Sequence, residues 1–184
     1  MATTLTTAIL CRNEASKDLS AVLTRCLQFS DHVLVLDDRS TDDSAKIAKD
    51  LGCQVRGRSV LKDLAWGAEA PARAELWAWG TEVAGDGWLL IADADQILHG
   101  APRPVMQSWE ANTVCIRLFD MWNSTHYRAD TYWGAYKVAR PWMVRPRFVP
   151  QGWTAQWATR GLHVGHLPAN WPMTAEMLEA ALAP

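Results

Sequence analysis

The sequence predicts an α/β fold with a Rossmann-like, mostly parallel central sheet flanked by helices. Two observations support this prediction. Short apolar runs alternate with segments whose apolar residues recur at helical spacing, and this alternation is typical of βαβ units. In addition, Gly52, Pro71 and Gly85-Asp86-Gly87 stand where helices are expected to end, begin or turn into the next strand.

The first half of the chain contains the regular elements. Leu19, Val22, Leu23, Cys26 and Leu27 recur at helical spacing and predict an amphipathic helix. Ser40 or Thr41 is expected to cap a second helix that runs to about Leu51, with acids in its first turn. A third helix is expected over 71–83. The predicted strands are 6–11, 33–36, 53–56 and 88–92.

The pattern becomes less regular after residue 95. Strands are expected at 114–119 and 143–149, and a helix is expected at 174–182, but seven prolines interrupt the rest. The sequence shows no internal repeat and no obvious linker. We therefore expect one domain over 1–184, with a regular half at 1–100 and a less regular half at 101–184.

Composition is that of a globular protein with a sizeable core. The chain has 184 residues, 49% of them hydrophobic and 21% charged. No run reaches the roughly 18 apolar residues that a membrane span needs, and residues 1–5 do not resemble a signal peptide. We expect a cytoplasmic protein. Its four cysteines form no CxxC pair and are expected to be buried free thiols.

Charge is distributed unevenly. Residues 1–100 contain 10 basic and 15 acidic residues, whereas residues 101–170 contain 8 basic and 3 acidic residues. Seven of the 11 tryptophans also lie after residue 100. The first half is thus acidic and regular, and the second is basic and aromatic.

Two acids one residue apart, Asp93 and Asp95, directly follow the apolar run at 88–92. No basic residue adjoins them in the sequence, so we expect only a hard cation or solvent to compensate their charge. The pair therefore predicts a divalent-metal site. A solvated turn after the strand is the alternative.

A second acidic cluster, at 37–43, follows the apolar run at 33–36. Ligands of open α/β sheets bind at the carboxyl ends of strands, so both clusters are expected to face one crevice. Helix capping explains part of this cluster, chiefly Thr41, Asp42 and Asp43. The candidates for function are Asp37 and Asp38.

Four motifs together resemble the nucleotide-sugar half of a family 2 glycosyltransferase of the GT-A fold. They are C-R-N-E at 11–14, D-D-R-S-T-D-D-S at 37–44, A-R-A-E at 72–75 and G-W-L-L-I-A-D-A-D at 87–95. The resemblance covers about residues 5–100. It implies that 1–100 binds a nucleotide-sugar, most simply a UDP-sugar, and that 101–184 binds the acceptor.

The resemblance also implies roles for individual residues. Asp38 would accept a hydrogen bond from the nucleotide base, Asp37 and Asp42 would shape its loop, and Glu14 would lie near the nucleoside. Arg73 would help to hold the nucleotide, although it could instead pair with Glu69 or Glu75. Asp93 would face the ribose and contribute to the metal site, and Asp95 would bind Mn(II) or Mg(II) on the diphosphate. The family commonly has Asn where this chain has Ala74.

A divalent ion suits this chemistry. It stabilises the departing diphosphate as a Lewis acid, and one or two carboxylates are enough to hold Mn(II) or Mg(II). His163 and His166, in an H-x-x-H sequence, are further candidates. Either imidazole could reach the metal or the diphosphate, or both could bond to backbone groups.

The catalytic base is expected among the aspartates beyond residue 95, because an inverting transferase needs a carboxylate at the acceptor hydroxyl. These are Asp120, which we place first, and Asp130. Either could instead pair with Arg128 or form a turn.

The basic, tryptophan-rich second half predicts an anionic acceptor, because indole rings stack on sugars and bases while arginine binds phosphate. A phosphorylated glycan or lipid and hydroxymethylated DNA fit this description, and the latter would make the protein a DNA-modifying enzyme. Several of the tryptophans are also expected in the core.

Other classes fit the motifs less well. A non-catalytic nucleotide-sugar or carbohydrate-binding module on the same fold is the chief alternative. A nucleotidyltransferase lacks its expected phosphate loop here, and a glycosidase would not need the nucleotide-binding cluster.

Overall fold

The computed structural model describes residues 3–59, 69–99, 112–121, 123, 125–129, 140–157, 166–172 and 178–179. Three helices in this part of the chain are α1 (Leu19–Phe29), α2 (Ser44–Asp50) and α3 (Glu69–Ala84). The strands are β1 (Leu5–Cys11), β2 (His32–Asp37), β3 (Gln54–Gly57), β4 (Trp88–Asp93), β5 (Thr113–Ile116), β6 (Arg140–Val144) and β7 (Leu178–Glu179).

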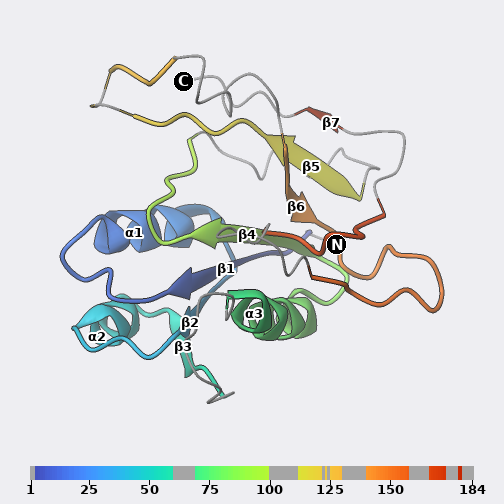
Figure 1. Ribbon diagram of the computed structural model, residues 1–184, viewed down its shortest axis with the longest axis horizontal. Helices are drawn as coiled ribbons and strands as arrows, with labels where there is room; N and C mark the ends of the chain where they lie inside the picture. The colour runs from blue at the N-terminus through green and yellow to red at the C-terminus, as the bar shows by residue number, and fades with distance from the viewer. Residues whose placement is uncertain are drawn as a thin grey trace.

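The strands form one mixed sheet in the order β3-β2-β1-β4-β6-β5-β7 (Figure 1). The first four of these are mutually parallel, whereas β6 runs antiparallel to both β4 and β5. β5 and β7 are parallel. The predicted α/β fold, a mostly parallel sheet flanked by helices, is confirmed.

Helices cover both faces of the sheet, because side chains alternate along each central strand. In β4, Trp88, Leu90 and Ala92 pack in the core that contains α1 and α2. Leu89 and Ile91 pack in the other core, with α3 and residues of 144–171. The next residue on the α3 face is Asp93, so the alternation directs this carboxylate toward α3.

The predicted strands of the first half are confirmed to within one residue at each end. The helix predicted over 71–83 is also present, as α3, with Pro71 in its first turn. All four cysteines are buried and free, as expected. No helix in the described ranges has both the length and the apolar character needed to cross a bilayer.

Three predictions about elements need correction. The second helix begins at Ser44 and not after Ser40 or Thr41, because those residues bond to the loop after β1. The strands expected at 114–119 and 143–149 are β5 and β6, which end at Ile116 and Val144. The helix expected at 174–182 is wrong at 178–179, which pair with β5 as β7; its other residues lie outside the described ranges, apart from these two.

Candidate functional site

The two acidic clusters lie at the same edge of the sheet. β1 separates β2 from β4, and all three strands are parallel, so their carboxyl ends meet. Cys11 at the end of β1 pairs with Asp37, and its neighbour Leu10 pairs with Asp93. The expectation that both clusters share one edge is confirmed.

Asp93 is held by basic and polar side chains from distant parts of the chain. Its Oδ1 accepts a hydrogen bond from Arg73 Nη2, and its Oδ2 lies 2.9 Å from His166 Nε2. Gln96 Nε2 donates to the same Oδ2 at 3.1 Å, and the Asp93 amide donates to Gln96 Oε1 at 2.7 Å. The expectation that only a cation or solvent compensates this carboxylate is therefore wrong for Asp93.

These contacts determine the ionisation of Asp93. Burial favours the neutral acid, but the hydrogen bond with His166 and the charge of Arg73 outweigh it and hold the pKa of Asp93 well below its ordinary value. The His166 ring also stacks on Trp142, with ring centroids 4.2 Å apart. Asp93 is thus a fixed anion between α3 and the segment at 166–172.

Arg73 makes both of the contacts that the sequence left open. Its Nε and Nη2 donate to Glu69 Oε1 at 3.1 and 2.9 Å, and Nη2 also bonds to Asp93. Its side chain is 5% exposed, and its Nη1 is enclosed without a hydrogen bond to any described residue. Arg73 thus retains a donor at the sheet edge.

Asp95 has a different environment. It is exposed, and it makes no ion pair with a described residue. Partial burial of the carboxyl, the adjacent charge of Asp93 and the charge of Glu14 raise the pKa of Asp95. Uncompensated negative charge therefore accumulates at Asp95, which is the condition that favours cation binding.

A divalent ion fits Asp95 better than it fits a cage of protein ligands. Within the described ranges, no three His, Cys, Asp or Glu side chains gather in a way that could hold a metal. Mn(II) and Mg(II) do not require such a cage, since water and substrate phosphates complete their coordination. The predicted roles of Asp93 and His166 as ligands stay predictions, and His163 lies outside the described residues.

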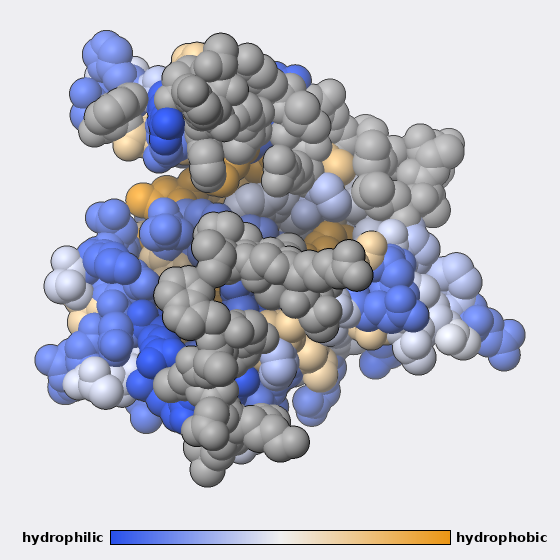
Figure 2. Space-filling model, viewed as in Figure 1, coloured by the Kyte–Doolittle hydropathy of each residue, from blue (hydrophilic) through white to orange (hydrophobic). Residues whose placement is uncertain are grey.

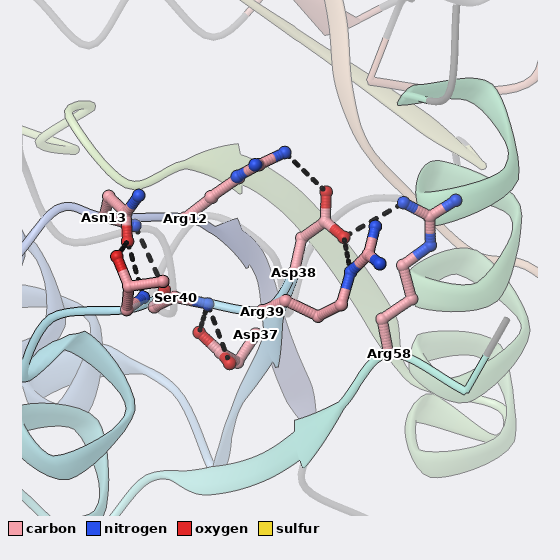
Figure 3. Close-up of polar contacts among 8 residues, drawn as sticks. Arg12, Asn13, Asp37, Asp38, Arg39, Ser40 and Arg58 are labelled. Carbon is pink, nitrogen blue, oxygen red and sulfur yellow. Dashed lines mark hydrogen bonds and ion pairs between the residues drawn. The ribbon is translucent and has the colours of Figure 1, made fainter. Parts of the chain in front are cut away.

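Three arginines surround Asp38 at the end of β2 (Figure 3). Arg58 Nη1 donates to Asp38 Oδ1 at 2.9 Å, and Arg39 Nε lies 3.9 Å from the same oxygen. Arg12 Nη1 lies 4.0 Å from Oδ2. Asp37 points away from this group, and its carboxylate accepts from the Ser40 amide at 3.3 Å.

The loops after β1 and β2 are joined by hydrogen bonds. The amide of Asn13 donates to Ser40 Oγ at 3.0 Å, and its Oδ1 accepts from the Thr41 amide at 2.8 Å (Figure 3). Asp42 accepts from the amides of Ala15 and Ser44, both at 3.0 Å. Asn13 and Arg39 adopt positive φ angles of 54° and 60°, which these bonds support.

Glu14 belongs to the same pair of loops. Its amide donates to Ser44 Oγ at 2.8 Å, and its carboxylate lies 2.9 Å from Lys17 Nζ. The structure thus brings Glu14 to the edge that carries Asp38 and Asp93, and its role toward a nucleoside stays a prediction. The surface over α2 and the adjoining loops is mainly hydrophilic (Figure 2).

The candidate bases are placed only in part. Asp120 lies 4.0 Å from Arg128 Nη1, and its carbonyl oxygen accepts from the Arg128 amide at 2.7 Å. Its side chain is 49% exposed, so this pairing with Arg128, anticipated from the sequence, leaves the carboxylate accessible. Asp130 lies outside the described residues.

Several basic and aromatic residues of the second half have structural roles. Arg145 lies over the rings of Trp88 and Phe148, and Arg147 pairs with Asp86 at 3.2 Å. Trp142 is buried in the first core. Three further tryptophans pack edge-to-face around Trp77, namely Trp153, Trp157 and Trp171. The expectation that several tryptophans belong to the core is confirmed.

Two partners in the site were not anticipated from the sequence, Arg58 for Asp38 and Gln96 for Asp93. Arg58 follows a short strand and belongs to no recognised motif. Gln96 lies three residues after Asp93, a spacing that fits the turn after β4 and could have suggested the contact. The contact with Arg58 depends on strand order and could not be inferred from spacing.

Comparison with known proteins gives partial matches. No protein-family model matches the chain. Uncharacterized proteins of Mycobacterium tuberculosis and Mycobacterium bovis are each 33% identical to it over 90 residues, which cover 47% of this chain and 22% of theirs. The chain thus spans about a fifth of the length of these curated relatives.

Solved structures with a similar arrangement include two sugar transferases. A glucosyl-3-phosphoglycerate synthase from Mycobacterium tuberculosis, in complex with Mn²⁺ and UDP-glucose, is 20% identical, with a TM-score of 0.46. A mannosyl-3-phosphoglycerate synthase from Rubrobacter xylanophilus is 18% identical, with a TM-score of 0.45. Each match covers 62% of this chain, and 43% and 40% of the respective neighbour.

Proposed function

We propose that this protein is a metal-dependent glycosyltransferase of the GT-A type, which transfers a sugar from a nucleotide-diphosphate sugar to an acceptor hydroxyl. One observation carries the proposal. Parallel strands β2 and β4 bring Asp38, surrounded by arginines, and the uncompensated Asp95 to one sheet edge. The strand-end motifs that resemble family 2 glycosyltransferases lie at this same edge.

The chain's own residues divide the work of binding the donor. Asp95 would hold Mn(II) or Mg(II), which supplies Lewis-acid stabilisation of the leaving diphosphate. Arg73, with an enclosed Nη1 that lacks a described partner, would donate to the nucleotide. Asp93, fixed by Arg73, His166 and Gln96, would present its carboxylate in one orientation to the ribose.

The transfer step needs a base. The acceptor oxygen would attack the anomeric carbon as the bond from that carbon to the diphosphate oxygen breaks, and the hydroxyl proton would pass to a carboxylate. Asp120 is the first candidate because its carboxylate is accessible, and Asp130 is the second. Inversion at the anomeric carbon follows from the family resemblance.

The acceptor is proposed to be anionic and to bind the half at 101–184. The charge count of the sequence supports this, with 8 basic and 3 acidic residues in 101–170, although Arg145 and Arg147 already have aromatic or acidic partners. We expect retention on a heparin column at low salt that is lost at about 0.2 M salt. Elution in the void volume at low salt would contradict an anionic acceptor.

Binding of the donor can be tested by thermal denaturation. A ligand that binds only the folded state raises the melting temperature, by about 2.7 kcal/mol of stabilisation at a hundredfold excess over Kd. We expect UDP-sugar with Mn²⁺ to stabilise the protein more than either alone. Asp95→Ala should abolish the metal-dependent part of this increase.

Asp50→Ala is the matched control, because Asp50 is exposed and pairs only with Lys46 among the described residues. This variant should keep the full metal-dependent increase. An equal increase in Asp95→Ala and the parent protein would contradict the proposed role of Asp95.

A further inference from the structure

Asp38 and Arg58 form an ion pair that is almost removed from water. The Arg58 side chain is 1% exposed and that of Asp38 is 13% exposed, and Arg58 Nη1 lies 2.9 Å from Asp38 Oδ1. Arg12 and Arg39 contribute two more guanidinium groups, at 4.0 and 3.9 Å. Three positive charges therefore surround one carboxylate, more than is needed to neutralise it.

The sheet fixes the position of Arg58. Gly57, the last residue of β3, pairs with Asp37, and the Arg58 amide donates to the Asp37 carbonyl oxygen at 3.0 Å. The pairing of β2 with β3 thus continues one residue beyond β3. Because the guanidinium group is planar and rigid, a fixed backbone and a buried side chain also fix the direction of its hydrogen bond.

The contact with Arg58 uses one oxygen of Asp38 and leaves the other available. Oδ2 accepts no hydrogen bond from a described residue, since Arg12 at 4.0 Å is too far for one. On the Oδ1 side, Nε and Nη2 of Arg39 are enclosed and also lack a hydrogen bond within the described ranges. An available acceptor therefore lies among guanidinium donors (Figure 3).

We propose that Arg58 is a positioning residue that turns Asp38 so that Oδ2 accepts the N–H of a nucleobase, while Arg12 and Arg39 donate to neighbouring carbonyl oxygens. The matching ligand has an N–H between two carbonyl groups, as uracil and thymine do. Cytosine has an unprotonated nitrogen beside an amino group at the same edge and is disfavoured. This inference rests on the proposed function and specifies the nucleotide that the site accepts.

Isothermal titration with UDP and CDP, both in the presence of Mn²⁺, tests the proposal. The parent protein should bind UDP at least about tenfold more tightly than CDP, as expected for a hydrogen bond to a charged group. Arg58→Lys keeps the charge but loses the planar fork, so it should reduce this preference to about threefold or less. The loss should come from weaker UDP binding, with the Mn²⁺ dependence unchanged.

Arg56→Lys is the control, because Arg56 is exposed on the same strand and lies over the Trp79 ring. It should keep the parent preference for UDP. A parent protein that binds UDP and CDP equally, or an Arg58→Lys variant with the parent preference, would overturn the role of Arg58.

Asp38→Asn gives a second test that does not depend on the stability of the Arg58 variants. Its amide can donate to the unprotonated ring nitrogen of cytosine, so the preference should shift toward CDP. An unchanged preference overturns the proposal. Failure of UDP, CDP and GDP alike to bind the parent protein would contradict the proposed function itself, whereas UDP binding without discrimination contradicts only this inference.

Discussion

Asp93 and Asp95 are one residue apart but lie in opposite electrostatic environments. Strand alternation directs Asp93 to the α3 face, where Arg73 and His166 compensate its charge. Asp95 follows after the strand has ended, and neighbouring acids raise its pKa. One carboxylate is therefore a fixed structural anion, and the other retains the capacity to bind a cation.

Replacement of Asp93 by Asn should destabilise the fold in a pH-dependent way. The pKa of Asp93 is lower in the folded protein than its unfolded value of about 3.9, so its stabilisation is present above that pH and is lost as the pH falls below it. We expect Asp93→Asn to cost about 1–3 kcal/mol at pH 7, as for hydrogen bonds to charged groups, and much less at pH 3.

Urea denaturation of both proteins at the two pH values measures this difference. Asp86→Asn is the control, because Asp86 is 84% exposed and its pairing with Arg147 is open to solvent. A cost for Asp93→Asn that is the same at pH 3 and pH 7 would contradict the ionic role of Asp93.

At the scale of elements, the site depends on the joining of two loops, one after β1 and one after β2. Ser44, the first residue of α2, is fully buried and connects them. Its Oγ accepts from the Glu14 amide at 2.8 Å and donates to Asp42 Oδ1 at 2.5 Å. The start of α2 is therefore fixed by contacts with the loop after β1.

Replacement of Ser44 by Ala should leave the Glu14 amide without its acceptor. An unsatisfied buried donor costs about 1–3 kcal/mol, so the free energy of unfolding should fall by that amount. Ser20→Ala, at an exposed position of α1, should change it by less than about 0.5 kcal/mol. Chemical denaturation measures both, and equal stability of the two variants would contradict the joining role of Ser44.

The elements differ in how far the sequence predicts them. The buried strands were predictable because their apolar runs end where polar residues begin, as at Cys11, Asp37 and Asp93. The start of α2 was not, because Ser40 and Thr41 bond to Asn13, which lies 27 and 28 residues earlier in the sequence. Capping signals describe local bonds and miss such long-range competition.

At the scale of the whole molecule, the same limit applies to the site. That Asp38 and Asp93 share one sheet edge followed from the rule for parallel strands. The partners of Asp93 did not follow, because His166 is 73 residues away in the sequence and is oriented by Trp142 of β6. The antiparallel strand β6 beside β4 brings this residue of the second half to the site of the first.

The central claim is that a cation bound by Asp95 accompanies the nucleotide at this sheet edge. A crystal structure with UDP and Mn²⁺, with the ion located by its anomalous scattering, tests the claim most directly. We predict Mn²⁺ within about 2.5 Å of an Asp95 carboxylate oxygen and in contact with the diphosphate. Manganese bound elsewhere, or a diphosphate held at this edge without any ion on Asp95, would contradict it.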